Sequence, residues 1–287
     1  MRWPPPNDWP HAETSRQVYC RPHRWHVQEM GQGETLILLH GAGGSTHSFR
    51  ALMPLLAGRF RVIALDLPGQ GFTQLGARHR SGLQDTAKDI GALCAQEGWT
   101  PRALVGHSAG GALALRLSER LLSPRGQTPD VVGINPALDN FKGLAGVLFP
   151  VLAKLLAAVP FTAQVFSASA SNPARIQSLI RSTGSELDTD GLSYYHRLIR
   201  DRDHADATLM MMAQWALDDL LHDLPEIETR TLFITGDRDA TVPPEVSDKA
   251  AGRMPQATRA TLPRTGHLAH EEAPEAVAAL ILDFLHG

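Results

Sequence analysis

The chain has 287 residues, 43% of them hydrophobic, and a formal net charge of −3. This length is enough for a large buried core, and the 27 basic and 30 acidic residues form no basic arm or tail of the kind that binds nucleic acid. The first residues lack the apolar run of a secretory signal, and Cys20 and Cys94 have no metal-binding or redox spacing. We therefore expect a cytoplasmic globular protein with two free thiols and no nucleic-acid partner.

Short apolar, β-branched runs alternate with helical patterns through most of the chain. The predicted strands cover residues 26–30, 35–41, 61–69, 102–106, 130–135, 229–239 and 257–263. The predicted helices of the same region cover residues 48–60, 82–98, 110–122 and 273–285. Strands that alternate with helices predict an α/β fold, with a mostly parallel sheet and helices on both faces.

This alternation stops between residues 137 and 224, where helical stretches are interrupted by prolines and no strand pattern occurs. We predict an α/β core of residues 1–136 and 225–287, and an all-helical lid of residues 137–224. The apolar stretch 143–161 of this lid contains Lys154 and is of borderline length, so a buried or lid helix fits it better than a membrane span. An exposed part of it could still rest on the inner or photosynthetic membrane.

The sequence Gly106-His107-Ser108-Ala109-Gly110 lies where a predicted strand is followed by a predicted helix. A serine on so sharp a turn needs a strained backbone, and glycines two residues before and after it relieve the crowding. This G-x-S-x-G pattern in its strand–turn–helix setting predicts a nucleophile elbow. Small residues also allow a helix to pack closely on a sheet, so the prediction depends on whether an acid and a base follow.

Two downstream loops supply these partners in the order serine, acid, histidine. Asp239 ends the predicted strand stretch 229–239, in the loop after its apolar run, and its spacing from the flanking glycine and proline favours it over Asp237, which stays open as the alternative. His267 follows the last predicted strand, whereas His270 lies nearer the next helix and fits a capping or packing role better. The carboxyl ends of parallel strands share one edge of a sheet, so these loops can converge on the serine.

Acyl transfer also needs two N–H donors for the oxyanion. We predict Ala109, at the start of a helix, and Ala42, in the glycine-rich turn after an early strand, with Gly43 as the alternative to Ala42. The same turn, with Asp66 after the next strand, partly matches a dinucleotide-binding motif, but its third glycine position falls on Thr46. No P-loop or H-E-x-x-H zinc motif occurs in the sequence, so we expect neither a cofactor nor a metal.

Together these motifs resemble those of the α/β-hydrolases, in order and in context. The chain also resembles a narrower family, the magnesium-chelatase accessory proteins of bacteriochlorophyll biosynthesis. The most specific similarity lies in the predicted lid, in the stretches "LAGVLFPVLAKLLA" and "MMAQWAL", and it extends to "GINPAL" and "GHLAHEEAP". This resemblance implies a role near magnesium insertion into a tetrapyrrole in a photosynthetic bacterium, with magnesium chelatase subunits as partners.

We therefore predict a serine hydrolase that cleaves an apolar ester, thioester or amide through an acyl-enzyme formed by Ser108, Asp239 and His267. Most apolar side chains of the lid are expected to form its own core. Three of them are predicted to bind the substrate, which could be a tetrapyrrole: Phe149, Met211 and Trp215. The alternative is a non-catalytic tetrapyrrole-binding or chelatase-assisting protein on a hydrolase scaffold.

Overall fold

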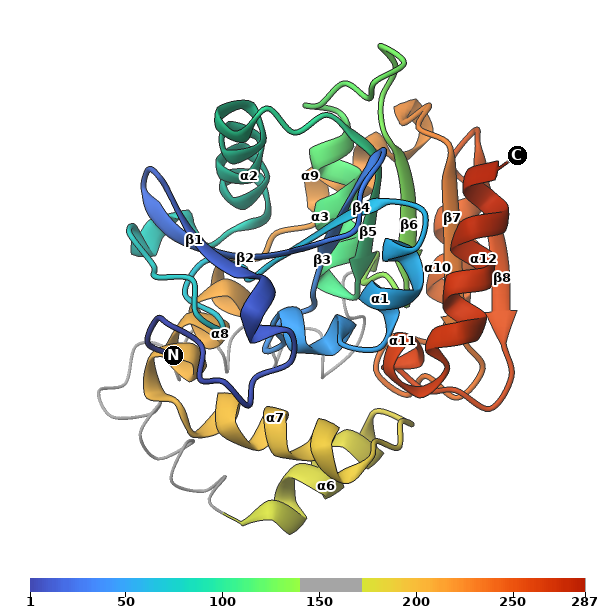
Figure 1. Cartoon of the computed structure of the whole chain (residues 1–287). Helices are drawn as coiled ribbons and strands as arrows, with labels where there is room; N and C mark the ends of the chain where they lie inside the picture. The colour runs from blue at the N-terminus through green and yellow to red at the C-terminus, as the bar shows by residue number, and fades with distance from the viewer. Residues whose placement is uncertain (140–171, 287) are drawn as a thin grey trace.

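The structure is a computed structural model that describes residues 1–139 and 172–286 (Figure 1). One eight-stranded sheet crosses the molecule in the order β1-β2-β4-β3-β5-β6-β7-β8. Its strands are β1 (Ser15–Cys20), β2 (His23–Met30), β3 (Thr35–Leu39), β4 (Arg61–Leu65), β5 (Pro101–His107), β6 (Asp130–Ile134), β7 (Thr231–Gly236) and β8 (Ala257–Leu262). Six neighbouring strands of this sheet pair in parallel, namely β4, β3, β5, β6, β7 and β8. At one edge, β2 pairs antiparallel with β4, and β1 pairs antiparallel with β2. The predicted mostly parallel sheet is confirmed.

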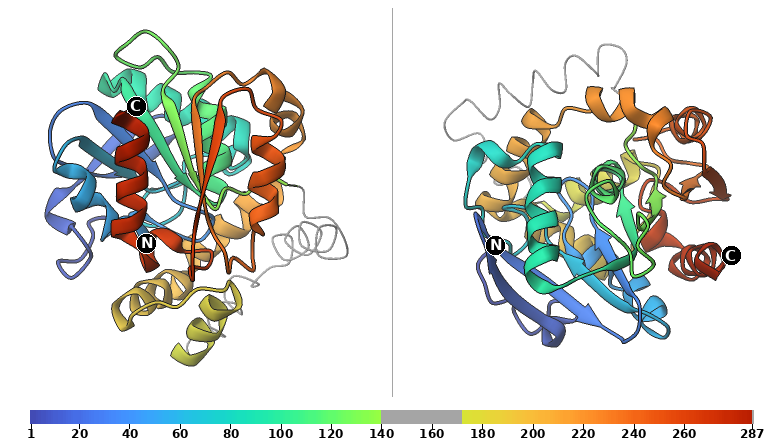
Figure 2. Two further views of the ribbon diagram at one scale, coloured as in Figure 1. Left: turned by 90° about the vertical axis from the view of Figure 1, so that its right-hand side faces the viewer. Right: turned by 90° about the horizontal axis from the view of Figure 1, so that it is seen from above.

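Helices cover both faces of this sheet, as the alternation of buried side chains along the strands requires. Ile37 and Leu39 of β3 face one apolar cluster, and Leu36 and Leu38 face the other. The first cluster includes residues of α2 (Leu83–Glu97), α3 (Ala109–Ser118) and α10 (Pro244–Ala251). The second includes residues of α1 (Leu52–Ala57), α11 (Ala269–Glu272) and α12 (Pro274–His286). Figure 2 shows α12 and α10 on opposite sides of β7 and β8. A strand buried on both faces reads as a continuous apolar run, which is why the sequence identifies these strands well.

The edge strand β1 has no recognisable strand pattern in the sequence. Only two of its six side chains are buried, those of Val18 and Cys20, so it lacks the apolar run that marks the central strands. Both cysteines of the chain are free and buried. Burial raises the pKa of the Cys94 thiol to about 12, so this thiol stays protonated and packs as an apolar group.

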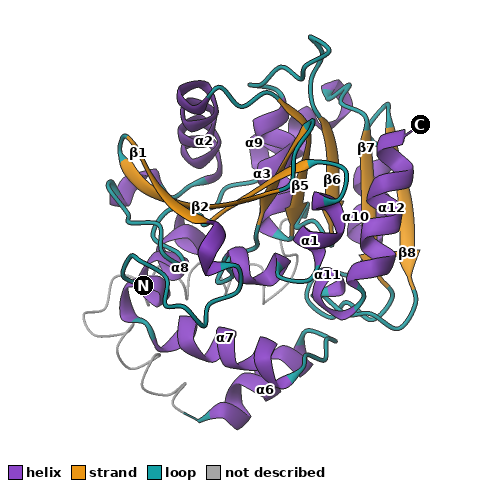
Figure 3. Ribbon diagram, viewed as in Figure 1, coloured by secondary structure: helices purple, strands orange, loops and turns teal. Residues whose placement is uncertain are grey.

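A helical insertion follows β6 and precedes β7. Its described helices are α6 (Pro173–Ser182), α7 (Thr189–Arg200), α8 (Arg202–Gln214) and α9 (Asp218–Asp223). Side chains of Asn172, Asp188 and Asp201 accept hydrogen bonds from the first turns of α6, α7 and α8, so each of these helices begins at a polar cap. Figure 3 shows only helices and loops in the described part of this insertion, in agreement with the predicted all-helical lid.

The exact limits of the lid, residues 137–224, stay a prediction, and the stretch 143–161 with Phe149 lies outside the described residues. Among the residues that the structure describes, no helix has both the length and the apolar character needed to cross a membrane. Figure 1 shows α6 and α7 beyond the end of the sheet toward which β8 points. In a parallel sheet this is the end at which ligands bind.

Candidate active site

Ser108 occupies the turn between β5 and α3, with a positive φ of 52° and a ψ of −117°, a backbone conformation that residues other than glycine rarely adopt. Its N–H donates to Ile134 O at 3.0 Å, so the neighbouring strand β6 fixes the turn. The flanking glycines are required by backbone contacts. A Cβ atom on Gly106 would lie 2.0 Å from Gly110 O, and one on Gly110 would lie 2.1 Å from Leu39 O. The crowding expected from the G-x-S-x-G pattern is therefore present as a clash that only glycine avoids.

His267 links Ser108 to Asp239 through its two ring nitrogens. Nε2 lies 3.0 Å from Ser108 Oγ, and Nδ1 lies 2.8 Å from Asp239 Oδ2. A carboxylate only accepts hydrogen bonds, so Nδ1 carries the proton and Nε2 is free to accept the serine hydroxyl proton. The second carboxylate oxygen, Oδ1, accepts from the N–H groups of Thr241 and Val242, both at 2.8 Å. These bonds fix the carboxylate plane and hence the imidazole.

The two alternatives from the sequence lie elsewhere. Asp237 is exposed and its Oδ1 accepts from the Arg264 N–H at 2.6 Å, so it closes the turn after β8. His270 is fully buried, and its ring packs 4.4 Å from the His107 ring centroid and 5.3 Å from that of Phe49. Burial, aided by the positive charges of neighbouring groups, lowers the pKa of His270 to about 3. His270 is a packing residue, in agreement with the role expected for it.

Two residues that the sequence analysis does not select hold the backbone of His267. Asn135, directly after β6, donates from Nδ2 to Gly266 O at 2.9 Å and to His267 O at 2.8 Å. Its Oδ1 accepts from the Gly236 N–H at 2.8 Å. The Nε2–H of His107 donates to the same His267 carbonyl at 2.9 Å, and burial keeps the pKa of His107 well below its usual value. In the sequence Asn135 is a single polar residue after a predicted strand, in "GINPAL", and only its burial in the structure reveals this role.

The loop that carries Ala42 is held at the next residue, Gly43, through hydrogen bonds to both its N–H and its carbonyl group. The Gly43 N–H donates to Gln70 Oε1 at 2.7 Å, so this alternative oxyanion donor already has an acceptor. The Gly43 carbonyl accepts from His204 Nε2 at 3.2 Å, and His204 Nδ1 accepts from the Gly71 N–H at 2.9 Å. His204 belongs to α8, so a helix of the insertion joins two loops at the edge of the candidate site.

Ala109 is the first residue of α3, with Ser108 as its N-cap. Its N–H is among the four that an α-helix leaves without an internal acceptor, and the helix dipole there favours negative charge. Ala42 is exposed and follows the buried Gly41. A Cβ on Gly41 would lie 3.0 Å from Ser108 Cβ, so the loop that continues into Ala42 approaches Ser108 closely. The role of Ala42 and Ala109 as oxyanion donors stays a prediction.

Two of the predicted substrate-binding residues lie in or next to α8. Met211 is buried, and its Sδ accepts a hydrogen bond from Gln70 Nε2 at 3.0 Å. Trp215 is half-buried at the end of α8 and packs against the larger apolar cluster of the core. Phe149 lies outside the described residues. Contact of these three side chains with a substrate stays a prediction.

Asp66 braces the loops beside the site. It is fully buried and accepts hydrogen bonds from His26 Nδ1 at 2.6 Å, the Thr46 N–H at 2.7 Å and the Phe72 N–H at 2.8 Å. Although burial opposes ionisation, these donors and the nearby His40 lower the pKa of Asp66 below its usual range. A carboxylate that is already bound in this way has no free oxygen to offer a ribose hydroxyl, which argues against the dinucleotide-binding alternative.

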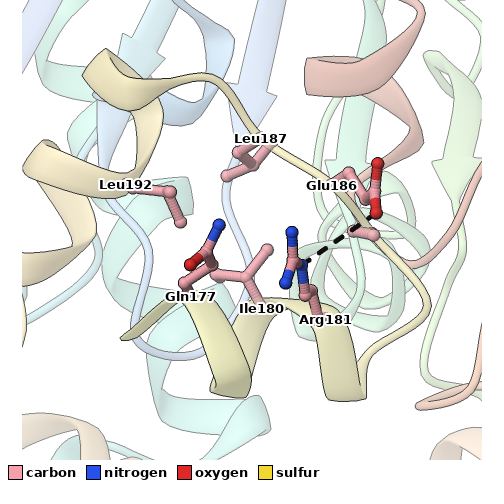
Figure 4. Close-up of a pocket in the computed structure, with 7 residues that line it drawn as sticks. Gln177, Ile180, Arg181, Glu186, Leu187 and Leu192 are labelled. Atoms are coloured by element: carbon pink, nitrogen blue, oxygen red, sulfur yellow. Dashed lines mark ion pairs between the residues drawn. The ribbon is translucent and has the colours of Figure 1, made fainter. Parts of the chain in front are cut away.

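A small surface hollow lies between α6 and α7, within the insertion (Figure 4). Ile180, Leu187 and Leu192 line it together with Gln177 and the Arg181–Glu186 ion pair, whose closest atoms are 4.0 Å apart. None of the residues of the Ser108–His267–Asp239 series borders it. The hollow is therefore not formed by these three side chains, although Ser185, which also lines it, accepts a hydrogen bond from the Leu268 N–H next to His267.

Comparison with known proteins gives the same fold. Residues 34–274 match the family model described as alpha/beta hydrolase fold. Over 284 residues, and 98% of each chain, the sequence is 44% identical to the magnesium-chelatase 30 kDa subunit of Rhodobacter capsulatus. It is 27% identical to 2-hydroxy-6-oxo-6-phenylhexa-2,4-dienoate hydrolase of Burkholderia cepacia, over 91% of each chain. Among solved structures, an alpha/beta hydrolase fold protein from Burkholderia ambifaria superimposes with a TM-score of 0.77 at 24% identity, covering 94% of this chain and 97% of that one.

Proposed function

Because the chain belongs to the α/β-hydrolase fold family, we propose that it is a serine hydrolase that cleaves an apolar ester, thioester or amide. The observation that carries this proposal is the hydrogen-bonded series Ser108–His267–Asp239, which begins at a strained turn. Backbone strain of this kind costs about 1–3 kcal/mol and persists where the surrounding structure enforces it, often at active sites. A protein that only binds a ligand has no need of these three side chains in this order.

The proposed reaction forms and then hydrolyses an acyl-enzyme. Ser108 Oγ attacks the substrate carbonyl while His267 Nε2 takes the hydroxyl proton, and the Asp239 carboxylate stabilises the imidazolium that results. The N–H groups of Ala42 and Ala109 bind the oxyanion of the tetrahedral intermediate. His267 then gives its proton to the leaving group, and a water molecule, activated by the same imidazole, releases the acyl group and restores Ser108.

The insertion is proposed as a lid of residues 137–224 that selects the substrate. The apolar side chains of Met211 and Trp215, with Phe149, would contact the apolar part of the substrate, because an adaptable thioether and aromatic faces suit large flat or long-chain molecules. The homologous magnesium-chelatase 30 kDa subunit leads us to propose a tetrapyrrole or a related pigment precursor as the natural ligand and a role in bacteriochlorophyll synthesis. The protein would then be located in the cytoplasm, with a peripheral contact at the inner or photosynthetic membrane.

Labelling with a fluorophosphonate tests the hydrolase proposal without knowledge of the substrate. We expect the wild-type protein to be labelled on Ser108 and the Ser108→Ala variant to be unlabelled. Asp237→Asn serves as the matched control for Asp239→Asn, because Asp237 lies two residues from Asp239 in the same loop but bonds Arg264. Labelling should fall strongly in Asp239→Asn and stay at the wild-type rate in Asp237→Asn. A folded wild-type protein that does not label would refute the proposal.

A second candidate function is supported by the 44% identity to a protein named as a chelatase subunit. On this view the chain binds a tetrapyrrole or chelatase subunits and assists magnesium insertion without catalysis of its own. Complementation separates the two functions. If a Ser108→Ala gene restores pigment synthesis to a deletion strain as fully as the wild-type gene does, the pathway role is non-catalytic. If the Ser108→Ala gene fails while its product accumulates and folds normally, the catalytic function is the one the pathway needs.

A further inference from the structure

The insertion reaches into the site through the short segment Thr183–Gly184–Ser185, which connects α6 to the start of α7. The Thr183 carbonyl accepts two hydrogen bonds, from the Ala240 N–H at 3.1 Å and from the His267 N–H at 3.3 Å. Ala240 follows Asp239 directly in the chain. One backbone oxygen of the insertion thus joins the loop that carries the acid to the loop that carries the base.

Gly184 packs closely between these two loops, backbone against backbone. Its φ of +83° is in the left-handed region, and an added Cβ would lie 1.9 Å from Arg238 O. In the other direction, a Cβ on Gly266 would lie 2.3 Å from Gly184 C. The backbone of the insertion is therefore inserted between the residue before Asp239 and the residue before His267, with no space for a side chain on either glycine.

The hydroxyl of Ser185 completes the contact on the histidine side. This side chain is fully buried, and its Oγ accepts from the Leu268 N–H, next to His267, at 2.8 Å. The neighbouring Glu186 N–H donates to Glu272 Oε1 at 3.0 Å, and Glu272 Oε2 accepts from the Gly266 N–H at 2.8 Å. Every backbone N–H from Gly266 to Leu268 is thereby bound, directly or through Glu272, to the segment after α6.

We propose that Thr183, Gly184 and Ser185 are positioning residues that hold His267 and Asp239 in register with Ser108. This inference rests on the proposed hydrolase function and assigns a second role to the insertion besides cover for the substrate. A movement of this segment away from the sheet would break the bonds to both loops together. Catalysis would then depend on the contact between this segment of the insertion and the two loops. Misplacement of a reacting group by about 1 Å can lower the rate about a hundredfold.

The principal test compares Gly184→Ala with Gly126→Ala. Both glycines have left-handed dihedral angles, with φ of +83° and +73°, but an added Cβ on Gly126 meets nothing within 4 Å. The readouts are kcat and KM for a p-nitrophenyl ester, and the low-field proton NMR resonance of the hydrogen bond between His267 Nδ1 and Asp239. We expect Gly184→Ala to lower kcat at least about tenfold with KM within about twofold of wild type, and to lose or shift the resonance. Gly126→Ala should keep both.

Ser185→Ala provides the same test if Gly184→Ala does not fold. Its matched control is Ser182→Ala, since Ser182 is the last residue of α6, three residues before Ser185, and its hydroxyl donates within its own helix, to Leu179 O. We expect Ser185→Ala to lower kcat without a matching rise in KM and to shift the low-field resonance, while Ser182→Ala keeps the wild-type values. Wild-type kcat and an unchanged resonance in a folded Gly184→Ala or Ser185→Ala protein would overturn the positioning role.

The NMR measurement keeps this inference separate from the proposed function. If the wild-type protein neither hydrolyses esters nor labels with fluorophosphonate, the hydrolase proposal fails. The low-field resonance still reports the alignment of His267 and Asp239 in that case. Its loss or shift in the folded variants supports the positioning role, and an unchanged resonance refutes that role whatever the activity of the protein.

Discussion

Ser108 and His267, the two proposed reacting side chains, are held by different parts of the chain. The turn at Ser108 is fixed mainly by the core, through backbone packing against β3 and a hydrogen bond to β6. The loop at His267 is held by a side chain of the core, Asn135, and by a segment of the insertion. On the proposed mechanism, the position of the nucleophile therefore depends on the sheet, whereas the position of the base depends on the insertion as well.

Because the supports of Ser108 are local in the chain and those of His267 are distant, the sequence predicts the first better than the second. Ser108 and its glycines lie within five consecutive residues, so the local pattern contains the steric reason for the turn. The converging loops of Asp239 and His267 follow from the general geometry of a parallel sheet. Asn135 and Thr183 could not be found in the same way. The first is one polar residue after a strand, and the second acts through its backbone carbonyl, which any residue would supply, so neither side-chain type signals the role.

The largest effect on stability should come from a substitution that disrupts the turn at Ser108, which the core holds. In Gly110→Ala the new Cβ would lie 2.1 Å from Leu39 O, backbone against backbone, so we expect failure to fold or a loss of stability of about 3 kcal/mol or more. Gly91→Ala is the matched helical control, because the nearest atom, Leu117 Cδ1, would lie at an ordinary 3.9 Å. Urea unfolding of both variants measures the effect. A Gly110→Ala protein as stable as Gly91→Ala would show that the elbow is not tightly packed.

Removal of the base should leave the core intact and abolish the chemistry. His267→Ala should lower kcat/KM for p-nitrophenyl esters at least about a hundredfold, the scale of general-base catalysis, because no other ring nitrogen contacts Ser108 Oγ in the described residues. His270→Ala is the control, since His270 packs beside His107 and makes no bond to the serine. Near-wild-type turnover by His267→Ala would point to another base.

A smaller loss should follow when the core support of the histidine loop is removed. Asn135→Ala deletes the donor to the Gly266 and His267 carbonyls and the acceptor of the Gly236 N–H. We expect a fall in kcat of about tenfold, together with reduced stability from the buried groups left unpaired. Steady-state kinetics and thermal unfolding measure the two effects. If stability falls while kcat stays unchanged, Asn135 supports the fold only, and His107 and the insertion suffice to align the base.

The smallest effect concerns the buried His270. Its pKa falls from an ordinary 6.5 to about 3 on burial, so the unfolded chain binds a proton between these values that the folded protein does not. Stability therefore decreases as the pH falls below about 6.5, with a contribution from His270 of about 1 kcal/mol at pH 6. His270→Leu should lose this part of the pH dependence. Urea unfolding at pH 8 and pH 6 measures it, and an unchanged slope would contradict the assignment of His270 as a neutral packing residue.

The central claim is that Ser108 forms a covalent acyl intermediate. The most direct test is mass spectrometry of the protein mixed rapidly with p-nitrophenyl acetate and quenched in acid. The account predicts one acetyl group on the peptide that contains Ser108, its absence in Ser108→Ala, and its slow formation in His267→Ala. A wild-type protein that is folded yet carries no acetyl group on Ser108 at any time of mixing would contradict it.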